Sequence, residues 1–387
     1  MKKIGIITSS HAKSGTYGWN YGAALQGYAL VRQLRDMGYE AYDINYLSKY
    51  EYNPKQYSLL KKTLKRIGLL FRPKIVKGKI KEIKMRKKLK QLNSSFTSFV
   101  KENKLTYNEG MFYSLEELHE ESKEFFAFVT GSDVVWNPYL HKNVNDPGYF
   151  LDFAEEGVKR IAYAPSFGVT SLPEQSRENL KSLLEKFEAI SVREQSGADL
   201  IFRETGIKVP VVLDPTLLLD PQKYDDIERK LVGLPREYIA VYKFGSIEHT
   251  DEKIKEISSK LHLPIVFIPS GDNKSYYSRY DIGPGEFLNI INNANLVLSD
   301  SFHCTVFCLI KHRPFLTFYR SIPNEKKNIN IRMINLLKTV DLSERLIKPG
   351  MDINYEELFS IDFNHSDNVI NELRKFSVSY LQNALEA

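Results

Sequence analysis

The sequence has little cysteine and no long apolar segment. Only two of its 387 residues are cysteines, Cys304 and Cys308, and their separation of one helical turn is poor for a disulfide. No stretch approaches the apolar length of a membrane span, and the start, MKKIGIITSSHAKSG, lacks the apolar run of a signal peptide. We therefore expect a cytoplasmic protein without disulfides.

Motifs of several common enzyme classes are also missing. There is no Gly-rich P-loop, and TSSHAKSG does not match the dinucleotide-binding fingerprint. The two cysteines lack a second pair and the eight histidines are scattered, so we expect no metal ion and no bound cofactor. A thiol nucleophile at Cys304 beside His303 is disfavoured, because sequence neighbours on a helix point in different directions.

Positive charge is concentrated in one segment. Residues 61–90 contain 14 Lys and Arg against one acid, Glu82, whereas the rest of the chain has 40 Lys and Arg against 47 Asp and Glu. This distribution indicates a local anionic partner. Apolar residues interleave with lysines as in an amphipathic surface helix, so we predict contact of residues 59–90 with the inner, anionic face of the plasma membrane. A solvated basic helix is the alternative, and nucleic acid is disfavoured because aromatic stacking platforms are absent from the pattern.

Short apolar runs alternate with helical patterns, which is typical of parallel sheets covered on both faces. We expect a first series of strands at KIGIIT, YEAYDINY, FFAFVTG, RIAYAPSFG, AISVRE and VPVVLDPTLLL, and a second at EYIAVYKF, PIVFIPS, ANLVLSDS and PFLTFY. The predicted fold is α/β, with two doubly wound, Rossmann-like lobes around a central cleft. The lobes span residues 1–215, with a basic helical insertion at about 55–105, and residues 216–345. A C-terminal helical tail, 346–387, has its last helix at about 367–386 and belongs to neither series.

Candidate site residues follow from the rule that ligands bind beyond the carboxyl ends of parallel strands. In the first lobe this rule selects Asn20, Tyr21, Gly22, Ser132, Asp133, Trp136, Ser166 and Arg193. In the second lobe it selects Lys243, Asp300, Ser301, His303 and Arg320. We expect these polar groups to gather in one cleft between the lobes.

Gly22 and Asn20 stand where the first strand gives way to a helix. Gly22 allows backbone to approach a ligand closely, and Asn20 and the first helix amides supply donors. An ordinary strand-to-helix turn with an Asn cap is the alternative.

The segment SDSFHCTVF predicts a helix whose first turn carries His303. Asp300 or Ser301 can cap that helix, a helix N-terminus favours an anion, and His303 can donate a proton near neutrality. A histidine packed at a helix start is the alternative. Arg193 can bind a carboxylate or phosphate through a bidentate pair of hydrogen bonds, or it can form a structural salt bridge with Glu194 or Asp214.

Six motifs in order resemble the polysaccharide pyruvyl transferase family: NYGAALQ, VTGSDVVWNP, YAPSFG, SVRE, VLDPTLLL and SDSFHCTVF. The resemblance implies a fold of the glycosyltransferase B type and transfer of the enolpyruvyl portion of phosphoenolpyruvate to sugar hydroxyls as a pyruvate ketal. It implies that Arg193 binds the anionic end of the donor and that His303 acts as acid or base. Beyond the resemblance, we expect Asp133 or Asp300 to complete the catalytic group by taking the hydroxyl protons, and Ser301, Lys243 and Arg320 to contribute to donor binding. Acceptor contacts would come from Asn20, Tyr21, Gly22, Ser132, Trp136 and Ser166.

The sequence departs from the family pattern around His303. Cys304 stands where relatives commonly carry Gly, and Ser301 and Phe302 stand where some members have Arg and Leu. One donor-binding charge is therefore missing, and the candidates to replace it are Lys243, Arg320 and Arg332. The expected partners are phosphoenolpyruvate and a saccharide acceptor, which can be lipid-linked, in bacterial surface or exopolysaccharide synthesis. A nucleotide-sugar glycosyltransferase of the same architecture and a non-catalytic carbohydrate-binding relative remain alternatives.

Overall fold

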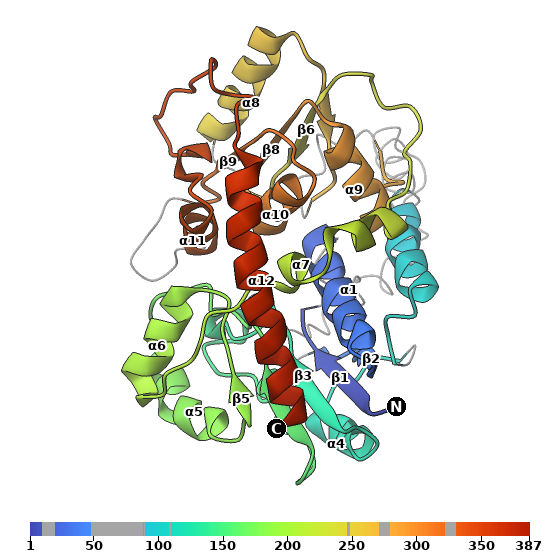
Figure 1. Cartoon of the computed structure of the whole chain (residues 1–387), viewed down its shortest axis with the longest axis vertical. Helices are drawn as coiled ribbons and strands as arrows, with labels where there is room; N and C mark the ends of the chain where they lie inside the picture. Colours follow the sequence, from blue (N-terminus) through green and yellow to red (C-terminus); the bar gives the residue numbers. More distant parts are fainter. Residues whose placement is uncertain are drawn as a thin grey trace, which may run out of the picture.

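The chain folds into two lobes, each built on a parallel sheet of five strands. The computed structural model describes residues 1–9, 20–47, 88, 90–107, 110–245, 248–270, 279–321 and 330–387. The strand orders are β2-β1-β3-β4-β5 and β10-β9-β8-β6-β7, and the two sheets lie in the lower and upper lobes of Figure 1. The predicted two-lobed, doubly wound α/β fold is confirmed.

The sheet of the first lobe comprises β1 (Lys3–Ile7), β2 (Glu40–Asp43), β3 (Ala127–Thr130), β4 (Lys159–Ala162) and β5 (Ala189–Ile190). Its helices are α1 (Tyr21–Asp36), α4 (Leu115–Ser122), α5 (Glu174–Leu184) and α6 (Gln195–Thr205). All four residues of β3 are buried, because helices cover both faces of a parallel sheet. This explains why the central strands read as continuous apolar runs.

The sheet of the second lobe comprises β6 (Ile239–Tyr242), β7 (Ile265–Phe267), β8 (Leu296–Ser299), β9 (Phe315–Phe318) and β10 (Leu346–Ile347). Its helices are α8 (Glu248–Leu261), α9 (Pro284–Asn293), α10 (Phe302–Ile310) and α11 (Ile331–Thr339). The short edge strand β10 lies in the C-terminal stretch where no strand was expected, because two apolar residues are too few to form a recognisable pattern.

The prediction of a strand at VPVVLDPTLLL is wrong. The segment makes only an isolated bridge between Val211 and Val192 and then forms the short helix α7 (Pro215–Leu218). Proline has no N–H for a sheet ladder, and Asp214 caps α7 by accepting a hydrogen bond from the Thr216 amide. The 3₁₀ helix η4 (Pro221–Ile227) continues the connection to the second lobe.

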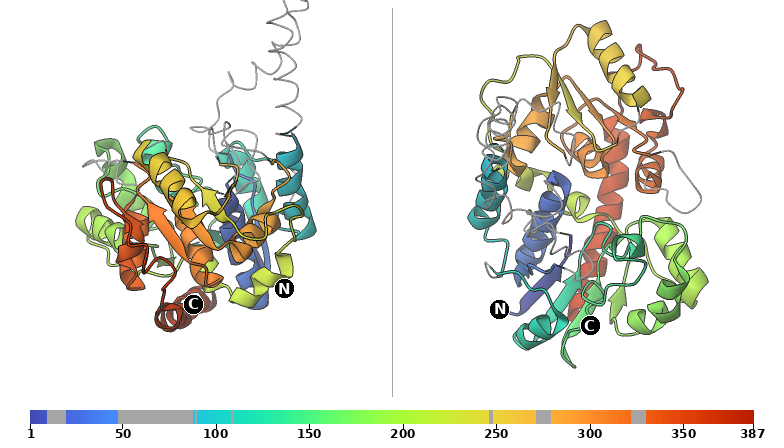
Figure 2. Two further views of the ribbon diagram at one scale, coloured as in Figure 1. Left: turned by 90° about the horizontal axis from the view of Figure 1, so that it is seen from above. Right: turned by 180° about the vertical axis from the view of Figure 1, so that it is seen from behind.

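The long C-terminal helix α12 (Phe363–Glu386) runs across both lobes, as Figures 1 and 2 show. It begins four residues before the predicted start, where Asp362 accepts hydrogen bonds from two backbone amides. The Leu213 amide donates to Ser377 Oγ at 3.0 Å, and Lys159 Nζ donates to the Leu385 carbonyl at 3.2 Å. On the second lobe, Asp367 of the helix pairs with His312 at 2.9 Å, so the helix fastens the first lobe to the second.

The predicted basic insertion is described only in part. Residues 90–102 are helical, and Leu92, Phe96, Phe99 and Val100 contribute to the core. Apart from Lys88 and Lys90, residues 59–90 lie outside the described part of the chain, so their membrane contact stays a prediction.

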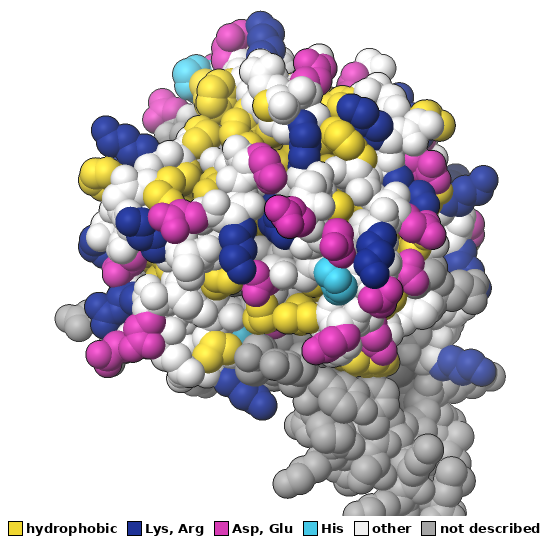
Figure 3. Space-filling model, turned by 90° about the horizontal axis from the view of Figure 1, so that it is seen from below, with side chains coloured by type: hydrophobic (Ala, Val, Ile, Leu, Met, Phe, Trp, Pro, Cys, Tyr) yellow, Lys and Arg dark blue, Asp and Glu magenta, His cyan; other side chains and the backbone are white. Residues whose placement is uncertain are grey.

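Charged side chains of both signs are mixed on the surface (Figure 3), and the two cysteines lie in the interior. Over the face in Figure 3, Lys and Arg side chains are interspersed with Asp and Glu. Cys304 and Cys308 are buried and unpaired. Within the described ranges, no helix combines the length and apolar character needed to cross a membrane.

Candidate active site

Asp214 lies at the centre of a buried polar cluster between the lobes. Its Oδ2 atom accepts hydrogen bonds from Ser132 Oγ at 2.7 Å and Arg193 Nη1 at 2.8 Å. The same oxygen lies 3.4 Å from His303 Nε2. Thr216 donates to Oδ1 through its amide at 3.0 Å and its hydroxyl at 2.6 Å. Arg193 of the first lobe and His303 of the second therefore meet on one carboxylate.

Local structure fixes both side chains. Arg193 follows β5 directly after the bridge between Val192 and Val211. His303 lies in the first turn of α10, whose N-cap is Ser301; the Ser301 hydroxyl accepts from the Cys304 amide at 3.5 Å. The predicted helix cap at Ser301 is present, and it orients the turn that carries His303.

Gly22 admits the imidazole of His303. A Cβ atom at position 22 would lie 2.4 Å from His303 Nδ1 and 2.6 Å from its Cβ, which is much closer than van der Waals contact. The sequence pattern alone assigned this glycine to close approach of a ligand. In the structure, the group that approaches the α1 backbone is the histidine itself.

A second ion pair crosses between the lobes at Asp133. Arg332, in the first turn of α11, donates from Nη1 to Asp133 Oδ1 at 3.3 Å. Arg193 Nη2 lies 3.9 Å from the same oxygen. Asp133 has a φ of 71°, in the left-handed region that non-glycine residues seldom adopt. This turn directs its carboxylate into the cluster.

Opposing effects set the protonation of the two aspartates. Burial alone would raise the pKa of Asp214, but the charges of His303 and Arg193 and the close contacts with His303 and Thr216 hold it well below its ordinary value. Burial also acts to raise the pKa of Asp133, and His303, Arg332 and Arg193 together lower it. Both carboxylates are therefore ionised at neutral pH and lie near His303.

Several buried donors in the cluster have no hydrogen-bond partner in the described part of the chain. They are Arg193 Nε and Nη2 and Arg332 Nε. A buried donor left unpaired costs roughly 1–3 kcal/mol, so such atoms commonly mark a place for a ligand or water. A cavity of about 490 Å³ opens beside Arg193, Arg332 and Phe302. The Arg193 guanidinium carbon lies 4.6 Å from the centre of the Phe302 ring.

The predicted acceptor residues divide into two groups. Ser132 and Ser166 join the cluster: Ser132 bonds Asp214, and Ser166 Oγ donates to Glu194 Oε1 at 2.6 Å. Glu194 Oε2 lies 3.5 Å from Arg193 Nε. The salt bridges that were the structural alternative for Arg193 are thus present, but within the described ranges they leave two of its nitrogens without hydrogen bonds.

Trp136 and Tyr21 belong to the core. Trp136 is 1% exposed, stacks on Phe150 at 4.7 Å and donates from Nε1 to the Tyr149 carbonyl at 3.1 Å. Tyr21 is fully buried, stacks on Phe287 of the second lobe at 4.8 Å and donates to the Ile282 carbonyl at 3.1 Å. Neither side chain offers a surface to an acceptor, so we leave both out of the site.

Asn20 has a local partner. Its side chain accepts a hydrogen bond from the Ala23 amide at 3.2 Å and caps α1, as the structural alternative for NYGAALQ predicted.

Asp300, Arg320 and Lys243 form contacts of their own in the second lobe. The Asp300 carboxylate accepts from the Phe244 amide at 2.9 Å and the Gly245 amide at 2.6 Å. Arg320 donates from Nη2 to the Asp300 carbonyl at 3.0 Å and lies over the Phe244 ring at 4.5 Å. Lys243 pairs with Asp251. Among the described contacts, none brings these three side chains to Arg193.

Asp214 is the central residue that the sequence pattern did not select. It was considered only as a salt-bridge partner, although it lies in the motif VLDPTLLL. An Asp-Pro pair before a short helix is a signal for a capped turn, which Asp214 makes through Oδ1. The partners of its other oxygen, Oδ2, come from distant parts of the chain. In the described part of the chain, no group of three or more His, Cys, Asp or Glu could hold a metal ion.

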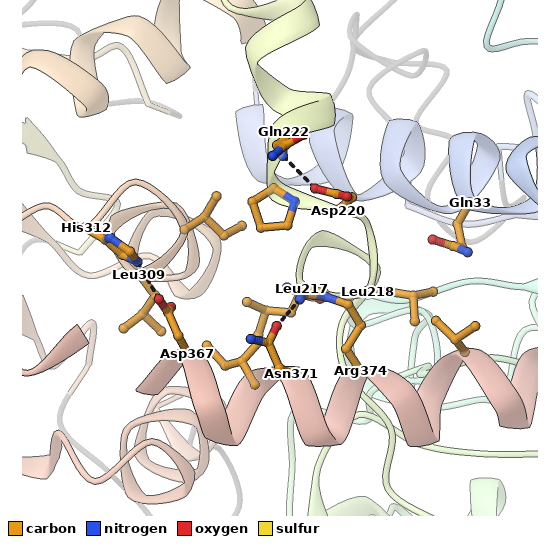
Figure 4. Close-up of a pocket in the computed structure, with 14 residues that line it drawn as sticks. Gln33, Leu217, Leu218, Asp220, Gln222, Leu309, His312, Asp367, Asn371 and Arg374 are labelled. Atoms are coloured by element: carbon orange, nitrogen blue, oxygen red, sulfur yellow. Dashed lines mark hydrogen bonds and ion pairs between the residues drawn. The ribbon is translucent and has the colours of Figure 1, made fainter. Parts of the chain in front are cut away.

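A second hollow lies on α12 and contains none of the predicted residues. It has a volume of about 520 Å³ and is lined by α1, α7, α10 and α12, as Figure 4 shows. Several of its polar side chains bond one another or the backbone: His312 pairs with Asp367 at 2.9 Å, and Arg374 donates from Nε to the Leu217 carbonyl at 2.8 Å. The buried arginine nitrogens of the cluster, which have no hydrogen bonds in the described part of the chain, lie instead around Asp214.

Solved structures similar to this chain include sugar-nucleotide enzymes. A putative UDP-N-acetylglucosamine 2-epimerase from Listeria monocytogenes is 8% identical with a TM-score of 0.48, covering 97% of this chain and 90% of that one. The UDP-GlcNAc 2-epimerase from Methanocaldococcus jannaschii, in complex with UDP-GlcNAc and UDP, is 14% identical with a TM-score of 0.46, covering 96% and 99%. The E. coli heptosyltransferase WaaC is 10% identical with a TM-score of 0.34, covering 95% and 99%. No curated protein matches the chain.

A family model provides the assignment. The model described as polysaccharide pyruvyl transferase matches residues 20–322. The match contains all six motifs, from NYGAALQ to SDSFHCTVF, together with Arg193, Asp214 and His303. It spans more than half of the chain and both lobes. The chain therefore belongs to the polysaccharide pyruvyl transferase family.

Proposed function

We propose that the protein transfers pyruvate from phosphoenolpyruvate to two hydroxyls of a saccharide, forming a ketal, in the synthesis of a bacterial surface polysaccharide or exopolysaccharide. The family assignment supports a transferase that acts on polysaccharide. The observation that carries the proposal is the meeting of Arg193 and His303 on Asp214, with two nitrogens of Arg193 left without a hydrogen-bond partner among the described residues.

In this reaction, protonated His303 gives its proton to the methylene carbon of phosphoenolpyruvate. Positive charge develops at the neighbouring carbon, and a sugar hydroxyl attacks there and loses its proton. The C–O bond to phosphate then breaks, inorganic phosphate leaves, and attack by a second hydroxyl closes the ketal with loss of another proton. Arg193 holds the anionic end of the donor, so that charge is stabilised by a group already oriented.

Asp133 is the better placed of the two predicted proton acceptors. It lies 3.9 Å from Arg193, and His303 is close enough to lower its pKa. The Asp300 carboxylate accepts hydrogen bonds from two backbone amides, which occupy its oxygens. We assign Asp133 to the hydroxyl protons and Asp300 to the support of the loop after β6.

A lipid-linked acceptor is part of the proposal. Residues 59–90 supply the positive charge for an anionic membrane surface, where each Lys or Arg contributes ~1 kcal/mol. Ser132 and Ser166 are fully buried and hold Asp214 and Glu194 on the first-lobe side of the cluster, so we assign them to support of the site and place the sugar on that side.

The direct test is a product assay. The purified protein is incubated with phosphoenolpyruvate and a panel of lipid-linked and nitrophenyl sugars, and products are detected by mass spectrometry with inorganic phosphate measured in parallel. We expect pyruvylated sugar and phosphate in equal amounts, both dependent on sugar and donor. Transfer of a sugar from a nucleotide sugar, with none from phosphoenolpyruvate, would assign the protein to the glycosyltransferase alternative.

Replacing Gly22 with Ala is expected to displace His303. The added Cβ would lie 2.4 Å from the imidazole Nδ1, so the ring must move. Because misplacement by about 1 Å can cost on the order of 10²-fold in rate, we expect turnover to fall by about that factor. Initial rates of pyruvyl transfer measure the effect.

Gly27→Ala is the matched control on the same helix. The nearest atom to a Cβ at position 27 is Asp43 Oδ2 at 4.0 Å, and alanine in a helix interior is favoured over glycine by roughly 0.5–1 kcal/mol. This variant should keep full turnover and unfold at a slightly higher temperature. Equal turnover of Gly22→Ala and Gly27→Ala would show that the contact with Gly22 does not position His303.

A further inference from the structure

Arg332 places a second buried guanidinium beside Arg193. It comes from α11 of the second lobe, is 7% exposed and makes one hydrogen bond from Nη1 to Asp133 at 3.3 Å. That bond is longer than the ~2.7–2.9 Å of a good charge-assisted hydrogen bond. Its buried Nε atom has no hydrogen-bond partner among the residues that the structure describes. The position lies outside the part of the chain that matches the family model, residues 20–322.

The surroundings disfavour a second positive charge at this place. Burial and the neighbouring charge of Arg193 lower the pKa of Arg332 to about 10, although Asp133 acts in the opposite direction. The guanidiniums of Arg332 and Arg193 share Asp133, at 3.3 and 3.9 Å. The other carboxylate at the centre, Asp214, is already bonded by Ser132, Thr216 and Arg193. An anion between the two arginines would satisfy donors that the protein leaves open.

The other candidates for the missing donor charge are engaged elsewhere. Lys243 pairs with Asp251, and Arg320 is held by the Asp300 carbonyl and the Phe244 ring. Of these three side chains, Arg332 is the one that faces Arg193.

The cavity of about 490 Å³ gives an anion room beside both arginines. Asn335, one turn along α11 from Arg332, also lines it, and its Nδ2 atom is buried without a hydrogen-bond partner in the described residues. Ser196, at the start of α6, also lines the cavity, and its buried Oγ atom has no hydrogen-bond partner in the described residues. Polar residues from both lobes thus line one space.

We propose that Arg332 is a further donor-binding residue, whose guanidinium joins that of Arg193 to hold the phosphate of phosphoenolpyruvate between the lobes. This inference rests on the proposed function. When phosphate takes the guanidinium of Arg332, Asp133 loses its closest ion pair and becomes a better acceptor for the proton of the attacking hydroxyl. Donor binding and activation of the acceptor are coupled in this way.

Arg332→Met and Arg332→Lys test the proposal, with Lys260→Met as the control. Lys260 is an exposed residue of α8 in the same lobe and lines neither cavity, so its variant should match the wild type. We expect Arg332→Met to raise the KM for phosphoenolpyruvate by roughly 10- to 10²-fold, since a hydrogen bond to a charged group contributes about 1.5–3 kcal/mol, with a smaller change in kcat. Arg332→Lys should recover part of the affinity, because lysine keeps the charge but loses the planar fork.

A second measurement separates this inference from the proposed function. Inorganic phosphate and phosphoenolpyruvate should each raise the melting temperature of the wild type, and the increase should shrink in both Arg332 variants. A wild-type KM and melting shift in Arg332→Lys and Arg332→Met would overturn the inference and leave pyruvyl transfer intact. Arg332-dependent stabilisation by phosphate, without pyruvylated product on any sugar, would support the anion site and reject the function. Should Arg332→Met fail to fold, Arg332→Lys alone decides, with a raised KM expected.

Discussion

His303→Asn is expected to lower turnover by about 10²- to 10⁴-fold, the contribution typical of a positioned general acid. Asparagine retains a polar group at the start of α10 but cannot transfer a proton to the donor's methylene carbon. Donor affinity depends mainly on the arginines, so the KM for phosphoenolpyruvate should change little. Initial rates of phosphate release and of ketal formation, measured over a range of donor concentrations, give both quantities.

His312→Asn is the control for this substitution. His312 is half exposed, pairs with Asp367 at 2.9 Å and lies beside α12, away from the cluster around Asp214. Its variant should turn over at the wild-type rate. If His303→Asn were as active as His312→Asn, His303 would have no part in the chemistry.

Asp214→Asn is expected to destabilise the fold as well as to disable the site. The substitution leaves Arg193 and His303 without the charge that holds them at 2.8 and 3.4 Å. Breaking a buried ion pair by removing one partner costs about 3–5 kcal/mol. We expect a loss of that order in the free energy of unfolding at pH 7, measured by denaturant titration.

The same substitution should change how stability depends on acid. In the folded protein, the pKa of Asp214 lies well below its ordinary value of 3.8. The unfolded chain therefore takes up a proton more readily, and the contribution of Asp214 is present above about pH 4 and lost as pH falls through that range. The melting temperature of the wild type should fall more steeply than that of Asp214→Asn between about pH 5 and pH 3.

Asp36→Asn controls for the removal of a carboxylate. Asp36 is an exposed residue at the end of α1 that pairs with Arg32 at 3.2 Å, and exposed pairs contribute about 0–1 kcal/mol. It should leave both stability and its pH dependence nearly unchanged. A melting profile of Asp214→Asn that overlays the profile of Asp36→Asn would remove Asp214 from the centre of the site.

The sequence predicted the fold well because parallel strands are buried on both faces. Runs such as KIGIIT and FFAFVTG are continuously apolar, and the polar residues directly after them mark the sheet edge where ligands bind. This rule selects Ser132, Asp133, Arg193 and His303 from the amino-acid pattern alone. The amino-acid pattern also predicts contacts between residues that are close in the chain, such as the cap at Ser301.

The direction of a side chain is not accessible in the same way. Trp136 follows a strand just as Ser132 does, but packs against Phe150 in the core. Tyr21 stacks on Phe287, far away in the sequence. Whether an aromatic residue after a strand turns towards the cleft or the core depends on tertiary packing, which no local pattern encodes.

Asp214 and Arg332 depend on how the lobes meet. The partners of Asp214 are Ser132, Arg193 and His303, and the approach of one lobe to the other brings His303 to it. Arg332 has no surrounding motif, and its pairing with Asp133 likewise joins one lobe to the other. Such contacts follow from the arrangement of the two sheets and the helix α12 that spans them.

The central claim is that one small anion lies between Arg193 and His303, and a crystal structure of the complex with phosphoenolpyruvate tests it most directly. The account predicts the phosphate on the guanidinium of Arg193 and the methylene carbon facing the imidazole of His303. Phosphoenolpyruvate bound in the hollow beside α12 (Figure 4), or at any place where it contacts neither residue, would contradict the account.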